Sequence, residues 1–193
     1  MRPFEAGALR AVLTFLLAAP LIGPAAQAAG PDNCQMQISN AAVDYGSTTR
    51  AELLHRQVSP LMMSLGTQRV TLTATCKTAT LMTLFFRGAA ADGNTYRMGQ
   101  GGSFTLRLSD ARLDGRAVGL GSVLTAGQAP ETKSDSLALP PGAGAVPILN
   151  DVPVRGLSLQ VQVEISAGIS ATGSRVADRT RFRGAGNFEL IEN

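Results

Sequence analysis

The sequence predicts an all-β protein in which two antiparallel sheets pack face to face. The first reason is that Thr, Val and Leu occur in short stretches between glycines and prolines, of which there are 21 and 10. The second is that no stretch has the pattern of a helix long enough for βαβ units. Only 16% of the 193 residues are charged and 45% are hydrophobic, which argues against a coiled coil and against general disorder. We therefore expect one domain with one core.

The first 28 residues are typical of a secretory signal peptide. Two arginines precede the almost wholly apolar residues 11–19, and the small residues at 26–28 form a cleavage site. Prolines and a glycine then interrupt the apolar run, so it is too short to span a bilayer as a helix. A buried helix and a membrane anchor are the alternatives. We expect residues 1–28 to be removed and residues 29–193 to form a single exported domain.

Alternation of polar and apolar residues identifies two clear strands, at 69–77 and 156–165. Their apolar rows are Val70, Leu72, Ala74 and Cys76 in the first strand, and Leu157, Leu159, Val161, Val163 and Ile165 in the second. Such alternation is typical of a strand with one buried and one solvated face. The stretch 81–87 is apolar at nearly every position, so we expect this strand to be covered on both faces.

The remaining elements are shorter, and we expect about seven or eight strands in total. The other expected strands are 34–46, 96–98, 103–109, 137–139 and 179–191, the last with Phe182, Gly184, Gly186, Phe188 and Leu190 in one register. Asp114 and Gly115 predict a tight hairpin, and the composition of residues 127–144 predicts a loop with one brief strand. Residues 47–60 are compatible with a short helical turn at 51–56 or with an irregular strand.

Cys34 and Cys76 are the only two cysteines in the chain. In an exported protein they meet an oxidising compartment, where they would form one disulfide that closes a loop of about 40 residues and restricts the unfolded chain. Two reduced, buried thiols are the alternative. A metal site with two cysteine ligands has less support, because His55 is the only histidine and nothing completes a tetrahedral set of ligands.

Charge and motifs argue against nucleic-acid binding and against catalysis. The net charge is +3 and the basic residues are dispersed, apart from Arg179, Arg181 and Arg183, which we expect on one solvated strand face. The chain lacks the G-x-S-x-G, P-loop and H-E-x-x-H motifs. Asp110 and Asp114 lie in a turn-rich stretch, where aspartate usually shapes the backbone. We therefore expect neither an enzyme nor a cofactor nor a nucleic-acid partner.

Several segments of residues 29–193, taken in order, resemble a known family. They are Cys34 near the start of the mature chain, Asp44-Tyr45-Gly46, a second cysteine at the end of Val70–Cys76 (VTLTATC), Phe85–Gly88 (FFRG), Phe104–Leu108, Asp110–Gly115 (DARLDG) and a C-terminal strand. The chain resembles the subunits of bacterial fimbriae of the chaperone–usher type, and in particular a branch of unknown function described as probable beta-fimbriae subunits. The cysteine spacing and the strand order together carry this resemblance.

The resemblance implies an immunoglobulin-like sandwich that lacks its final strand, which leaves a hydrophobic groove open. A periplasmic chaperone would first fill the groove with an extended strand, and a neighbouring fimbrial subunit would replace it at the outer-membrane usher. The implied site residues are Cys34 and Cys76 for a disulfide, Phe182, Phe188 and Leu190 for the groove, and Asn193 for the carboxylate that anchors the chaperone. The protein would pass through the periplasm to the cell surface as a structural or adhesive subunit.

Two features depart from the family pattern. Many of these subunits carry a tyrosine next to the last residue, where this chain has Glu192. The family also has a long alternating donor strand before the first cysteine, whereas the five residues 29–33 precede Cys34 in the expected mature chain. Such a segment extends about 17 Å and contains no large apolar side chain. We therefore expect a subunit that accepts a donor strand without giving one, at a fibre tip or as a minor subunit.

Two other functions remain open from the sequence. Residues 182–191 are also compatible with an ordinary core strand of a complete sandwich, and the protein would then be a self-complete exported module that binds a sugar or another protein. Copper binding in the periplasm is a more distant alternative. Its candidate ligands are His55, Met36, Met62, Met63, Met82 and Met98, which do not repeat at a ligand-like spacing.

Overall fold

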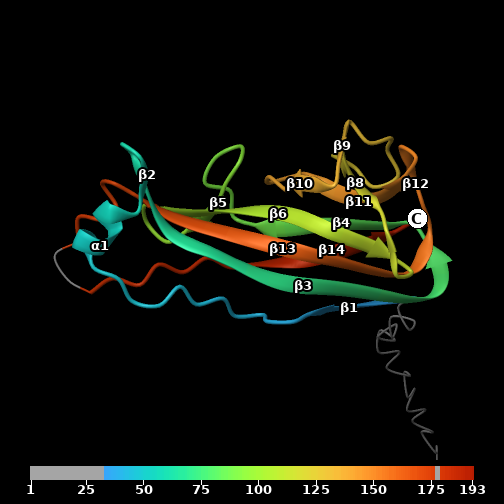
Figure 1. Ribbon diagram of the computed structural model, residues 1–193, viewed down its shortest axis with the longest axis horizontal. Helices are drawn as coiled ribbons and strands as arrows, with labels where there is room; N and C mark the ends of the chain where they lie inside the picture. Colours follow the sequence, from blue (N-terminus) through green and yellow to red (C-terminus); the bar gives the residue numbers. More distant parts are fainter. Residues whose placement is uncertain (1–32, 177–178) are drawn as a thin grey trace, which may run out of the picture. The chain divides into compact units, whose positions relative to one another are not determined.

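The computed structural model describes residues 33–176 and 179–193, which fold into one β-rich unit (Figure 1). The expected signal peptide, residues 1–28, lies outside the described residues. Within the described ranges, no helix is long and apolar enough to cross a membrane. Helix α1 (Arg50–His55) begins with a capping box between Thr49 and Glu52, and its position agrees with the short helical turn that the sequence allows.

The described strands form two sheets. Sheet A has the order β1 (Cys34–Ile38), β3 (Met62–Thr80), β13 (Gly156–Ser170), β6 (Gly102–Leu113) and β10 (Ser136–Ala138), with β2 (Gln57–Ser59) beside β3, and β5 (Tyr96–Met98) and β7 (Arg116–Ala117) beside β6. Sheet B has the order β14 (Gly186–Glu192), β4 (Met82–Gly88), β11 (Gly144–Leu149), β8 (Gly119–Val123) and β9 (Thr132–Ser134), with β12 (Val152–Pro153) beside β11. Every pairing is antiparallel. The predicted all-β fold with two antiparallel sheets is therefore confirmed.

Three long strands form the centre of sheet A. Figure 1 shows β3, β13 and β6 lying side by side, and β13 stays paired with β3 from Gly156 to Ser170. The alternation predicted for residues 69–77 is confirmed, because the apolar row from Val70 to Cys76 is buried in the main core between the sheets. Leu157 was expected in the inner row of β13 but is 46% exposed, since the register shifts between Gly156 and Ser158.

Strand β4 is buried on both faces, as its sequence predicts. Met82, Leu84 and Phe86 belong to the main core between the sheets. Phe85 belongs to a second cluster with Val123, Val146 and Ile148, which lies on the outer face of sheet B. The apolar run at 81–87 therefore contributes side chains to two separate hydrophobic clusters.

The sequence underestimates the number of strands and misplaces the last one. The described residues contain 14 strands, several of which are glycine-rich and lack alternation. In β11, a side chain at Gly144 would come within 2.6 Å of the Phe85 ring, so packing rather than propensity selects glycine there. The C-terminal strand was expected at 179–191, but it begins only at Gly186. The reason is that its ladder partner β4 ends at Gly88, directly opposite Gly186.

Turns and the disulfide follow the sequence prediction. Asp114 and Gly115 join β6 to β7 with positive φ at both positions, as a two-residue hairpin requires. Cys34 and Cys76 lie directly opposite each other on β1 and β3, with a Cα–Cα distance of 3.9 Å, and form a disulfide. The cross-link fixes one edge strand of sheet A to the long strand beside it.

Aromatic rings pack against glycines where the C-terminal segment crosses the core. The Phe86 ring lies 4.8 Å from the Tyr96 ring and 5.0 Å from the Phe188 ring, both edge to face. A Cβ atom at Gly186 would collide with the Phe86 ring, and one at Gly184 would lie 2.7 Å from the Phe104 ring. Both glycines therefore let the backbone approach the aromatic cluster.

We expect Gly186→Ala to lower the free energy of unfolding by about 1–3 kcal/mol, because the added methyl group must displace the Phe86 ring. Gly93→Ala is the matched control, since a Cβ atom at Gly93 meets no atom within 4 Å. Chemical denaturation of both variants measures the difference. Equal stabilities for the two variants would contradict the close packing of this ring on β14.

Candidate functional site

Two strand edges without a described partner meet on the same side of the sandwich. β1 is the edge strand of sheet A, and β14 is the edge strand of sheet B. Their ends touch, because the Cys34 N–H at the start of β1 donates to Glu192 at the end of β14. We call this side of the molecule, bordered by β1 and β14, the open side.

The outer edge of β14 carries backbone groups that the ladder with β4 does not use. Asn193 and Leu81 exchange both backbone hydrogen bonds, each 3.1 Å long, and the register continues to Gly186 without a shift. Since hydrogen-bonded and non-hydrogen-bonded pairs alternate in an antiparallel ladder, every second residue counted back from Asn193 faces β4. The N–H and C=O groups of Gly186, Phe188 and Leu190 therefore point away from β4, toward the open side.

The same alternation applies to β1. Lys77 N–H donates to the Asn33 carbonyl, and Ser39 N–H donates to the Thr71 carbonyl, both at 2.9 Å. Odd-numbered residues of β1 therefore face β3, and the backbone groups of Cys34, Met36 and Ile38 point toward the open side. The bond from Cys34 N–H to Glu192 agrees with this direction.

Apolar side chains line both edges and are only half-buried. The residues concerned are Met36 and Ile38 on β1, Val43 and Tyr45 beyond it, Phe188 and Leu190 on β14, and Phe182, all packed against the main core. On both strands, the residues with unused backbone groups are also those with apolar side chains directed at the core. The two rims of the open side therefore share one pattern.

The floor between these rims is the inner face of sheet A, and part of it is uncovered. Gln68 continues the inner row of β3 that begins with Cys76, yet its side chain is exposed. Its partner across the ladder is Ile165, which is half-buried even though it lies on the central strand β13. Leu65 is half-buried as well. Inner-face residues of a central strand such as β13 are normally buried in a complete sandwich, so the floor is incompletely covered at Ile165; Gln68 lies beyond the last β1 pair, Ile38 with Leu72, where β3 is itself an edge.

The structure places three of the four residues predicted for the groove and the chaperone anchor along this side. Phe188 and Leu190 lie on β14, while Phe182 lies in the segment without strand pairing and approaches Gly99 and Gly102. Asn193 follows β14 and is held by Leu81 and by the Thr80 hydroxyl, which donates to its carbonyl at 3.1 Å. The roles of these four residues toward a partner stay predictions.

One feature of the open side was not found from the sequence. Glu192 accepts from Cys34 N–H at 3.1 Å with one carboxylate oxygen and from the Asn33 amide at 2.9 Å with the other. The Asn33 side chain also accepts from the backbone N–H and the hydroxyl of Thr78, at 3.0 and 2.9 Å. These contacts join the start of β1, the end of β14 and the end of β3. No sequence pattern relates residues so far apart.

Comparison with known proteins identifies the family of this chain. Residues 26–128, more than half of the chain, match the family described as "Protein of unknown function (DUF1120)". The chain belongs to this family. Among solved structures, the crystal structure of the P pilus rod subunit PapA is similar, with a TM-score of 0.39 and 14% sequence identity over 84% of this chain and 100% of that chain. No curated protein matches the sequence.

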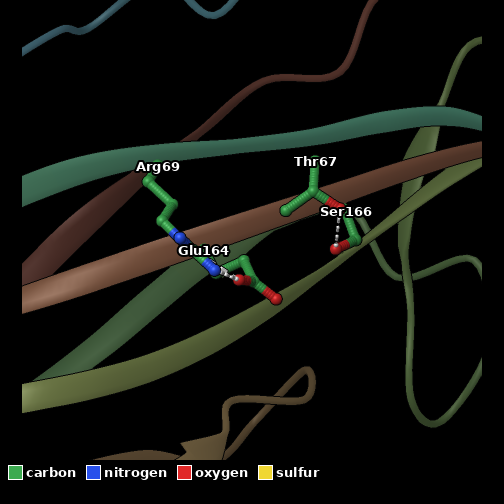
Figure 2. Close-up of polar contacts among 4 residues, drawn as sticks. All are labelled: Thr67, Arg69, Glu164 and Ser166. Carbon is green, nitrogen blue, oxygen red and sulfur yellow. Dashed lines mark hydrogen bonds and ion pairs between the residues drawn. The ribbon is translucent and has the colours of Figure 1, made fainter.

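The outer face of sheet A in this DUF1120 protein is polar. Figure 2 shows Arg69 on β3 directed at Glu164 on β13, with an N–O distance of 2.9 Å, and Thr67 hydrogen-bonded to Ser166. Glu164 and Ser166 also line a hollow of about 230 Å³, together with Arg107. The Arg69 side chain of this ion pair is 74% exposed, so the pair contributes little to stability. The apolar rims and the polar outer face therefore lie on different surfaces.

The candidate copper ligands do not gather at one place in the structure. Met82 and Met98 belong to the main core, whereas Met63 packs with Leu53 and Ile169 in a separate cluster. His55 is exposed in the last turn of α1. In the described part of the chain, no three His, Cys, Asp or Glu side chains lie close enough to hold a metal ion.

The two tyrosines of the DUF1120 protein predict a loss of stability at high pH. Burial raises the pKa of Tyr45 and of Tyr96 to about 12, from an ordinary value of 10.0. The Tyr45 hydroxyl donates to the Ile165 carbonyl, at 2.7 Å, and the Tyr96 hydroxyl to the Leu139 carbonyl. Folding favours the neutral form of both tyrosines. The stabilisation that results from this preference is complete below pH 10 and is lost as the pH rises toward 12.

Spectrophotometric titration should therefore show little tyrosinate near pH 10 in the folded protein. Denaturation at several pH values should show stability falling between pH 10 and 12. Tyr45→Phe, which cannot ionise, should make that fall smaller. A fall of unchanged size in this variant would show that Tyr45 is solvated rather than packed on β13.

Proposed function

We propose that this protein is a structural or adhesive subunit of a chaperone–usher surface fimbria, and that its open side accepts a β-strand from another chain. The observation that carries the proposal is the pair of edges, β1 and β14, with unused backbone groups and half-buried apolar side chains; the inner face of sheet A is uncovered just beyond β1, at Gln68 and Ile165. An added strand would supply hydrogen-bond partners for the unused backbone groups of both edges. It would satisfy backbone groups of Leu190 and Phe188 and cover the half-buried apolar rims.

The chemistry of the open side fits an extended segment with apolar residues at alternate positions. Backbone groups along the rims give affinity for any strand, and pockets for every second side chain give specificity. Phe188 and Leu190 would contact these side chains from β14, and Phe182 would contact them beyond its end. A long unpaired edge also pairs readily with other chains, so a dedicated partner would protect the protein from aggregation.

The proposed partners follow from this role. A periplasmic chaperone would occupy the open side first, with the Asn193 carboxylate as its anchor, and neighbouring fimbrial subunits would replace it at the outer-membrane usher. The Cys34–Cys76 disulfide supports export, because disulfides persist in oxidising compartments such as the periplasm and the cell surface. We propose a tip or minor position in the fibre and a structural rather than catalytic role.

A donor-like peptide should stabilise the purified protein. The probe is a synthetic strand of seven residues, the length of β14, with valine at alternate positions, threonine between them and lysines at both ends. At a peptide concentration of about 100 times Kd, the free energy of unfolding should rise by about 2.7 kcal/mol. A scrambled peptide with adjacent valines is the control. Equal melting temperatures with and without the alternating peptide would favour a self-complete binding module.

Amide exchange should locate the added strand. In the free protein, the amides of Asn187, Glu189 and Ile191 face β4 and should exchange slowly, whereas those of Phe188 and Leu190 face the open side and should exchange faster. The peptide should slow Phe188 and Leu190 and leave the other three nearly unchanged. Protection spread evenly along β14 would contradict edge pairing.

A further inference from the structure

We infer that Glu192 closes one end of the open side and acts as a stop that fixes how far an incoming strand can extend. This inference rests on the proposed function, because it concerns the strand that the open side accepts. Its structural basis is the contact of the Glu192 carboxylate with Cys34 N–H and with the Asn33 amide. These bonds connect the two rims directly.

The Glu192 contact uses a backbone group that an added strand would need. Cys34, Met36 and Ile38 are the residues of β1 whose backbone groups point toward the open side, and Cys34 is the first of them. Its N–H already donates to Glu192 at 3.1 Å. A strand that runs along the open side can therefore pair beside Met36 and Leu190, but it meets the Glu192 side chain before it reaches Cys34.

The contact is held firmly in place by the residues around it. Asn33 is fixed by Thr78, Cys34 by the disulfide to Cys76, and the residue after Glu192 by two backbone bonds to Leu81. Because each partner is fixed independently, little conformational freedom remains to be lost when the carboxylate bonds form. The stop is therefore preformed in the free protein.

The opposite end of the open side lacks such a connection. In the described part of the chain, no hydrogen bond or ion pair joins residues 40–48 to residues 182–187. Gln68 and Ile165, the uncovered part of the floor, lie toward this end, away from the disulfide. Among the described residues, hydrogen bonds therefore tie the two rims together at Glu192 and not at the other end. An incoming strand would enter there, and its register would be set where it meets Glu192.

The test compares Glu192→Ala with Glu189→Ala. Glu189 also carries a carboxylate on β14, but this side chain points to the outer face and pairs with Arg87. Glu189→Ala therefore removes the same charge as Glu192→Ala and leaves the Glu192 contact intact. Each protein is titrated with the seven-residue alternating peptide and with two versions extended by two residues, one at each end. Amide exchange at Cys34 is measured without peptide.

In the unchanged protein and in Glu189→Ala, the Cys34 amide should exchange slowly and neither extension should improve Kd by more than about twofold. In Glu192→Ala, the Cys34 amide should exchange faster, and one of the two extensions should lower Kd by about fivefold, as expected for one additional backbone hydrogen bond. This pattern supports the stop.

Two results overturn the inference while leaving the proposed function intact. One is fast exchange of the Cys34 amide in the unchanged protein, which would show that the Glu192 contact is not formed. The other is binding of the short peptide with the same response to extension in all three proteins. Failure of every peptide to bind any of the proteins overturns the proposed function and, with it, the role of Glu192 as a stop.

Discussion

The register between β14 and β4 determines what the open side can bind, because side-chain and backbone directions both alternate with a period of two along a strand. Phe188 and Leu190 direct their side chains at the core and their backbone groups away from β4. A shift by one residue would instead bury Asn187 and Glu189 and would break the ion pair between Glu189 and Arg87. The register that completes the core therefore also prepares the edge for another strand.

The unequal lengths of the two sheets explain where the gap lies. β3 has 19 residues and β4 has seven, so at about 3.3 Å per residue β3 is about 40 Å longer. Sheet B cannot cover the whole inner face of sheet A. The unpaired segment around Phe182 and the segment around Tyr45 cover part of the remainder. Gln68 and Ile165 lie where neither the second sheet nor these segments complete the layer.

Most of the fold follows from local sequence patterns, whereas the site depends on contacts between distant segments. Period-two alternation predicts residues 69–77 of β3 and most of β13, because these stretches have one solvated face, but it misses the first seven residues of β3. It misses β11, where glycine and proline occupy positions that packing decides, and it fails at Leu157, where a bulge shifts the register. The Glu192 contact joins residues 158 and 159 positions apart, so no local pattern could reveal it.

An edge that must accept one strand also has to reject others. A flat, wholly apolar edge would pair with any exposed strand, and its affinity would come without selectivity. Here Glu192 blocks one end of the rims and Gln68 places a polar amide in an otherwise apolar floor. Glu192 lowers the affinity for strands that are too long, and Gln68 lowers the affinity for strands that cannot match its amide. Specificity is usually obtained in this way, at the expense of affinity. The same side chains that limit indiscriminate pairing therefore define the strand that fits.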